Sequence, residues 1–144
     1  MKASQNAVER IKKYEGFSSK PYLCPAGKAT IGYGSTFYPD GKKVTLKDKA
    51  ITKDEGEVLL RETIKTFEKI LEKRLTVSVS QNQYDAVLSH TFNTGGSDTL
   101  FKLINEKKFK DAATWIKTRY TTSNGKVLKG LVARRNEEYE LFIS

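Results

Sequence analysis

The sequence predicts an α+β protein with two lobes, in which a long helix joins a small β lobe to a helical lobe. All three prolines and a cluster of glycines lie in residues 17–50, as is typical of short strands separated by turns. Apolar patterns of helical period run over residues 52–74 and fill most of residues 80–144. We expect a single domain, with the β lobe at about 15–50 and the connecting helix at about 52–74. The helical lobe is expected at about 80–144, together with a helix at 3–14.

The elements of the first half follow from local patterns. Apolar residues recur at helical spacing from Ala7 to Tyr14, so a short amphipathic helix opens the chain and ends near Gly16. The β-prone residues 30–33 lie among the turns and predict a small hairpin or meander. A capping box that begins at Thr52 then predicts the start of the long helix.

The second half is predicted to be helical. A second capping box begins at Ser80 and opens a helix that Gly95 stops. The later elements are, in order, a short helix capped by Asp98 and ending at Asn105, a helix over residues 109–117, a loop over residues 121–125, and a last helix through Arg134 to Phe142.

The composition excludes several classes of protein. The 144 residues are 38% hydrophobic and 30% charged, as in an ordinary soluble protein, and no apolar run approaches the ~20 residues of a membrane span. The N-terminus lacks the apolar core of a secretory signal peptide. A single cysteine and a single histidine exclude a disulfide framework and a cluster of soft metal ligands. Nucleotide-binding glycine motifs are also absent, so we expect no metal and no cofactor.

The charge of the chain is basic and unevenly distributed. Lys and Arg total 26 against 17 Asp and Glu, giving a formal net charge of +9. The excess lies in residues 1–50 and 107–135. Such a surface favours a polyanionic partner, which can be nucleic acid, an anionic membrane or a bacterial wall, although a basic pI alone also fits a soluble protein without such a partner.

Glu15 is the best candidate for catalysis. It follows the apolar face of the first helix where that helix gives way to the turn-rich lobe, so aromatic neighbours could desolvate it and keep it protonated as a general acid. Most glutamates at helix ends are solvated and inactive, which is the alternative. A Ser/His/Asp triad would depend on His90, which we interpret as a structural helix residue.

The order Glu15, Cys24, Thr30, followed at once by Ile-Gly-Tyr-Gly, resembles the phage-type lysozyme family of endolysin muramidases, glycoside hydrolase family 24. The family motif has a Glu, eight residues, an Asp, five residues and a Thr, and both spacings occur here. Three further segments extend the resemblance over essentially the whole chain: residues 83–87, residues 92–95, and residues 130–138 with their GLxxRRxxE pattern.

The resemblance implies a two-lobed lysozyme-like fold and hydrolysis of the β-1,4 bond between N-acetylmuramic acid and N-acetylglucosamine in peptidoglycan. It implies that Glu15 is the general acid and that Thr30 positions the attacking water, with inversion at the anomeric carbon. Thr30 could also be present only for its strand propensity. Cys24 replaces the usual Asp, as it does in some members. Its thiolate, favoured by the nearby charge of Lys20 and Lys28, could act as base or nucleophile, or its thiol could only fill space.

The resemblance also implies residues that contact the saccharide. Phe92 could equally belong to the core, and Trp115 is interpreted as a core residue rather than a sugar platform. Arg134 and Arg135 could hold the first helix through ion pairs or face solvent. The residues implied to line the cleft are Thr36, Phe92, Asn93 and Thr99.

Peptidoglycan is therefore the expected partner, with no nucleic acid and no membrane span, and a monomer is expected. The chain would stay soluble in the host cytoplasm until it is released to the wall, through a holin if it is phage-encoded. Two alternatives stay open. One is a lytic transglycosylase that uses Glu15 without a carboxylate partner, and the other is a basic wall-binding module without catalytic activity.

Overall fold

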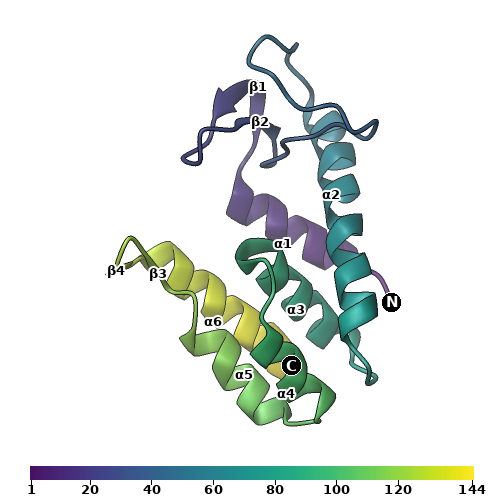
Figure 1. The fold of residues 1–144 in the computed structure, drawn as a ribbon, viewed down its shortest axis with the longest axis vertical. Coiled ribbons are helices and arrows are strands. Elements are labelled where there is room, and N and C mark those ends of the chain that lie inside the picture. The colour runs from purple at the N-terminus through teal and green to yellow at the C-terminus, as the bar shows by residue number, and fades with distance from the viewer. The chain divides into compact units, whose positions relative to one another are not determined.

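A computed structural model describes residues 1–144 (Figure 1). Its six helices and short antiparallel strands confirm the α+β class. The chain forms two compact units, one of residues Val8–Thr66 and one of Met1–Ala7 together with Phe67–Ser144. The elements are α1 (Gln5–Glu15), β1 (Ser18–Leu23), β2 (Ala29–Gly32), α2 (Lys53–Arg74), α3 (Gln81–Thr94), α4 (Asp98–Asn105), α5 (Phe109–Thr118), β3 (Thr122–Ser123), β4 (Lys126–Val127) and α6 (Lys129–Ile143).

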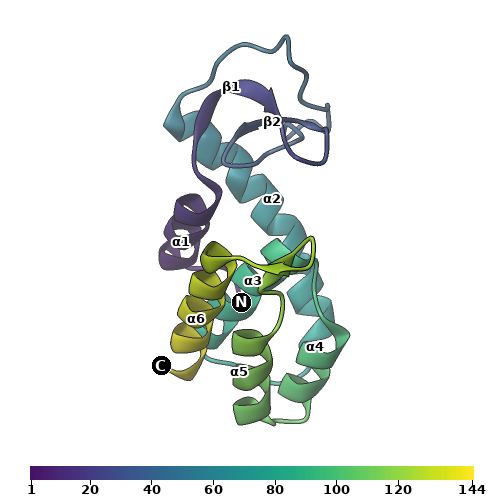
Figure 2. The same ribbon diagram turned by 90° about the vertical axis from the view of Figure 1, so that its left-hand side faces the viewer.

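The Val8–Thr66 unit contains the expected hairpin of β1 and β2 (Figure 2). The two strands pair antiparallel, with Tyr22 opposite Thr30. Successive side chains of a strand point to opposite faces, so Ile31 of β2 faces away from Thr30. Ile31 is fully buried and packs with Val44 and Leu59 in a small core. One face of β2 therefore packs on this core through Ile31, and the Thr30 side chain lies on the opposite face.

The capping box that opens α2 is confirmed. The Glu55 backbone N–H donates to Thr52 Oγ1 at 3.1 Å, and the Thr52 N–H donates to Glu55 Oε1 at 3.0 Å. Gly56 follows in the first turn, although glycine weakens a helix by about 1 kcal/mol relative to alanine. A Cβ at residue 56 would lie 2.8 Å from the Phe17 ring, so the aromatic packing of this unit requires the glycine.

The loop between β2 and α2 is anchored by a carboxylate. Asp48 accepts hydrogen bonds from the Thr45 hydroxyl at 2.6 Å, the Thr45 N–H at 2.8 Å and the Tyr38 hydroxyl at 2.6 Å. These donors stabilise the ionised form, so the Thr45 hydroxyl first, and then Tyr38, hold the pKa of Asp48 below its ordinary value.

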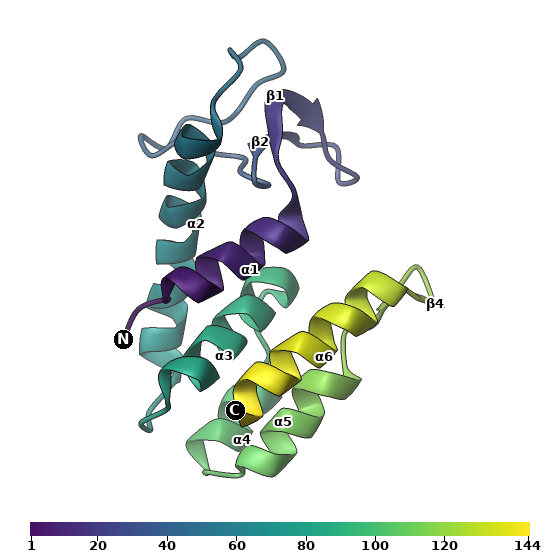
Figure 3. The ribbon, with the colours of Figure 1, turned by 180° about the vertical axis from the view of Figure 1, so that it is seen from behind.

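In the helical unit α3 packs against α6, α6 against α5, and α5 against α4 (Figure 3). The Ser80 capping box and the left-handed Gly95 that ends α3, with φ 87°, are both confirmed. Residues 84–91 of α3 are all buried, so this helix is enclosed on every side. Fully buried apolar side chains of the unit include Leu71, Val87, Leu88, Leu100, Ile104 and Ile116.

Two local expectations are wrong. The N-cap of α4 is Ser97, whose hydroxyl accepts the Leu100 N–H at 3.3 Å, whereas Asp98 is already the first helical residue. The expected loop at 121–125 is part of a small hairpin in which β3 pairs with β4. Its turn residues Asn124 and Gly125 have φ of 51° and 77°, as a type I′ turn requires. The flanking residues lack the apolar alternation that would have indicated strands.

Candidate active site

Glu15 is the last residue of α1 and is half-buried. Gly16 ends the helix with φ 70°, and its N–H donates to the Lys12 carbonyl at 2.9 Å. The carboxylate of Glu15 lies against Gly34, in the tight turn that follows β2: a Cβ at residue 34 would lie 3.2 Å from Glu15 Oε2. The carboxylate therefore lies close to the backbone of this turn, and the glycine at 34 leaves room for that approach.

Cys24 and Thr30 meet at the end of the β1–β2 hairpin. The turn between the strands is closed by the Cys24 N–H, which donates to the Lys28 carbonyl at 2.9 Å. The pKa of the half-buried Cys24 thiol is lowered from its ordinary value by a hydrogen bond with the Lys28 backbone and, to a smaller extent, by one with the Thr30 side chain. Hydrogen bonds therefore favour the thiolate, and the lysine charges invoked from the sequence are not the cause.

The Thr30 side chain is 3% exposed, and its hydroxyl donates to the Lys28 carbonyl at 3.0 Å. A hydroxyl has a single hydrogen, so it cannot donate to this carbonyl and to the Cys24 sulfur at the same time. Deprotonation of Cys24 would favour rotation of the hydroxyl toward the sulfur. Cys24 and Thr30 thus form a coupled pair within the same unit as Glu15.

The residues expected to contact the saccharide are divided between the two units. Thr36 lies in the Val8–Thr66 unit and lines a pocket there. In the other unit Phe92 is half-buried, with its ring 5.1 Å from that of Phe67. Asn93 is exposed, and its Oδ1 accepts a hydrogen bond from Arg135 at 2.7 Å, which leaves its N–H₂ free to donate. Thr99 is exposed in the first turn of α4.

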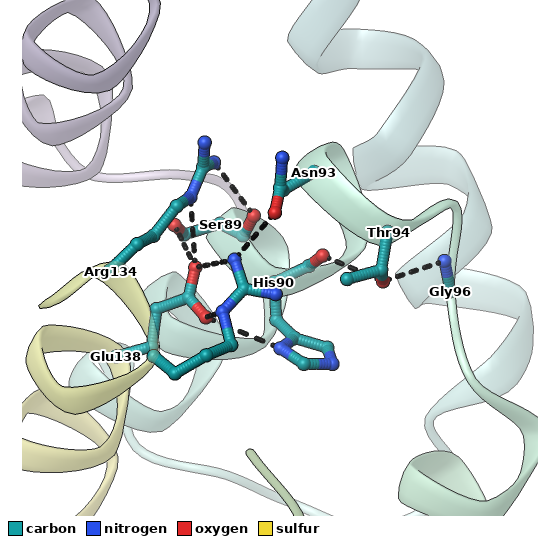
Figure 4. Close-up of polar contacts among 8 residues, drawn as sticks. Ser89, His90, Asn93, Thr94, Gly96, Arg134 and Glu138 are labelled. Carbon is teal, nitrogen blue, oxygen red and sulfur yellow. Dashed lines mark hydrogen bonds and ion pairs between the residues drawn. The ribbon is translucent and has the colours of Figure 1, made fainter. Parts of the chain in front are cut away.

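Sequence reasoning missed the buried ionic cluster of the helical unit (Figure 4). Glu138 is 2% exposed and accepts hydrogen bonds from Ser89 at 2.7 Å and from Arg134 Nε at 3.3 Å. Arg135 contacts the same carboxylate through Nε at 3.1 Å and Nη2 at 3.3 Å. The idea that both arginines face solvent is therefore wrong. The signal was present, because an acidic residue three and four positions after two basic residues shares a helix face with them.

His90 is completely buried beside this cluster, with Nδ1 3.2 Å from Glu138 Oε1, as expected of a structural residue. Trp115 is half-buried, and the Arg119 guanidinium covers its ring at 4.5 Å from the centroid. No group of three or more His, Cys, Asp or Glu side chains is arranged to hold a metal ion. None of the helices has the length and hydropathy needed to cross a membrane.

Comparison with known proteins identifies the family. Over 151 aligned residues the chain is 37% identical to the endolysin of Acyrthosiphon pisum secondary endosymbiont phage 1, covering 100% of this chain and 99% of that protein. It is 38% identical to the endolysin of Bacillus phage PZA, aligning over 100% of this chain and 56% of that protein. A crystal structure of a P22 lysozyme mutant has a TM-score of 0.87 and 31% identity, with 100% of this chain and 99% of that chain covered. The phage lysozyme family profile matches residues 12–138, and the chain belongs to that family.

Proposed function

We propose that the protein is a muramidase that hydrolyses the β-1,4 bond between N-acetylmuramic acid and N-acetylglucosamine, with Glu15 as the general acid. As a member of the phage lysozyme family, the chain is a peptidoglycan-lysing enzyme. The observation that carries the finer proposal is the half-buried Glu15 carboxylate held against Gly34, in the same unit as the coupled Cys24 and Thr30.

In the proposed reaction Glu15 donates a proton to the glycosidic oxygen as the bond from that oxygen to the anomeric carbon breaks. Water adds to the opposite face of the same carbon, which inverts its configuration. Thr30 orients this water through its hydroxyl. The water proton leaves to the Cys24 thiolate, and the lowered pKa of that thiol supports this role.

A lytic transglycosylase is the second candidate, and the thiol at position 24 favours it. Such an enzyme has a glutamic acid but no carboxylate partner, and the 6-hydroxyl of the sugar replaces water as the nucleophile. The products distinguish the two reactions, because hydrolysis creates a reducing end whereas the transglycosylase leaves a 1,6-anhydro ring. Anhydro products from washed walls would overturn the hydrolytic proposal.

The test of the acid is Glu15→Gln, which preserves the shape of the side chain but cannot donate the proton. Because general acid catalysis typically contributes 10²–10⁴-fold, lysis of washed walls should fall by at least about 10²-fold. Glu9→Gln is the matched control, since it removes a charge from an exposed position of the same helix. Thermal unfolding monitored by circular dichroism should show that both variants are folded.

Two results would count against this assignment. Residual lysis of the Glu15→Gln protein within tenfold of the parent would remove Glu15 from the acid role. A parent protein that binds walls but releases no sugar ends would instead support a wall-binding module without catalytic activity.

A further inference from the structure

A pocket of about 190 Å³ opens in the Val8–Thr66 unit, beside the β1–β2 hairpin. Pockets that enclose a whole small molecule usually measure roughly 300–1,000 Å³, so this one suits one group of a larger molecule. The residues that line it are Lys28, Ala29, Thr36, Phe37, Lys43 and Val44.

The pocket combines an aromatic surface with two positive charges. Phe37 is 50% exposed and lies opposite Lys43 in an antiparallel bridge, which puts the two side chains on the same face of the bridge. Lys28 adds a second ammonium group from the turn of the hairpin. An apolar ring together with two cations in one pocket suits a ligand that carries an anionic group on a partly apolar body.

No acidic side chain lines the pocket, and neither Lys28 nor Lys43 takes part in an ion pair. In the same unit Lys12, Arg61 and Lys65 do form ion pairs with glutamates. Both pocket lysines therefore remain available to an external anion.

The pocket is distinct from the Cys24–Thr30 pair. Ala29 and Thr30 are adjacent in β2, and adjacent side chains of a strand point to opposite faces. Ala29 packs toward the small core that includes Val44, which also lines the pocket, whereas Thr30 interacts with Cys24. The pocket therefore lies on the face of β2 opposite to Thr30.

We propose that this pocket binds a carboxylate of a peptidoglycan peptide stem, away from the bond being cleaved, and so holds the enzyme on the wall. Lys28 and Lys43 pair with the carboxylate, and the Phe37 ring covers the apolar part of the stem. The proposal rests on the proposed function, which supplies peptidoglycan as the substrate. Carboxylates and phosphates are both oxyanions, so the experiment must also separate peptide stems from teichoic acid.

The test measures binding to purified sacculi free of teichoic acid, with Glu15→Gln present in every protein to prevent digestion. Lys28→Gln/Lys43→Gln is compared with Lys47→Gln/Lys49→Gln, which removes the same charge from exposed positions of the same unit outside the pocket. Exposed ion pairs contribute about 0.2–1 kcal/mol each, so the loss of two pairs should make the pocket variant bind about twofold to thirtyfold more weakly than the control.

Two further arms test the chemistry of the ligand. When the sacculus carboxyl groups are converted to amides, the two double variants should bind equally. Phe37→Ala should weaken binding to untreated sacculi more than Leu46→Ala, which truncates a side chain of similar exposure, 54%, outside the pocket.

Equal binding of the two double variants to untreated sacculi would overturn the proposal, as would a difference that persists after amidation. A difference seen only on walls that carry teichoic acid would assign the pocket to phosphate and overturn the carboxylate. Digestion of the same sacculi by the protein with Glu15 intact is measured in parallel. Its failure would contradict the proposed function, whereas digestion together with equal binding of the double variants would contradict the pocket alone.

Discussion

Replacing Glu138 with glutamine tests whether the buried cluster stabilises the helical unit. The carboxylate is the shared partner of two guanidinium groups that are themselves 5% and 0% exposed. Glu138→Gln removes the negative charge but leaves both positive charges buried. Breaking a buried pair in this way typically costs about 3–5 kcal/mol. Glutamine keeps the volume and an acceptor for Ser89, so we expect a loss near the lower limit, about 3 kcal/mol.

The loss is measured by urea unfolding and by thermal unfolding. For a chain of this length about 3 kcal/mol corresponds to a fall in Tm of roughly 10 °C. Glu140→Gln is the control, because Glu140 lies on the same helix, carries the same charge and is exposed. Its substitution should change stability by less than about 0.5 kcal/mol.

Added salt distinguishes a buried charge effect from a surface one. Charges inside the protein are screened much less than those in solvent, so the loss for Glu138→Gln should persist in about 1 M salt. If Glu138→Gln costs less than about 1 kcal/mol, or its effect disappears in salt, the cluster does not stabilise the fold through charge neutralisation.

Three further predictions concern the Val8–Thr66 unit. Gly34→Ala and Gly27→Ala both introduce a Cβ at a residue with positive φ. Only the Cβ at residue 34 would contact the proposed catalytic carboxylate of Glu15. Only Gly34→Ala should therefore lower turnover on walls, by roughly tenfold. Equal turnover of the two variants would refute this positioning. Thr30→Val should raise the pH at which alkylation of the Cys24 thiol is half-maximal, because a hydrogen bond that lowers its pKa is lost; an unchanged midpoint would exclude that hydrogen bond. Asp48→Asn should destabilise the protein at neutral pH. The difference in stability between the parent and the variant should vanish as the pH falls through the lowered pKa of Asp48. The reason is that a carboxyl group whose pKa is depressed in the folded state stabilises the protein only while it is ionised. A difference in urea midpoint that is constant from pH 7 to about pH 2 would contradict it.

Most helix boundaries could be predicted because their causes are local. The capping boxes at Thr52 and Ser80 join groups three residues apart, and Gly95 ends α3 by its own conformation. The error at α4 is also local, since Ser97 and Asp98 are both good N-caps and the sequence does not say which one leaves the helix. The Asn-Gly pair at 124–125 is typical of a tight hairpin turn, but the polar residues on either side of it do not indicate strands.

For the candidate site, the sequence alone determined the residue types and their spacing, and hence the family to which Glu15, Cys24 and Thr30 point. Only the tertiary structure decided that the Thr30 side chain lies within hydrogen-bonding reach of the Cys24 thiol and that Gly34 leaves room for the Glu15 carboxylate. Folding the hairpin and the following turn brings these groups together, and their side-chain contacts depend on the register of the strands.

The basic pair of α6 shows most clearly what the sequence left undecided. A run of arginines followed by glutamates at helical spacing suits a solvated helix face as well as a buried one. The structure buries Arg134, Arg135 and Glu138 because Ser89 and His90, 49 and 48 residues away from Glu138, lie beside them on α3. Burial depends on which distant segments pack together, whereas a cap or turn depends on neighbours along the chain. The sequence therefore determined the helices and their ends, and the packing of α3 against α6 decided which charges lie inside.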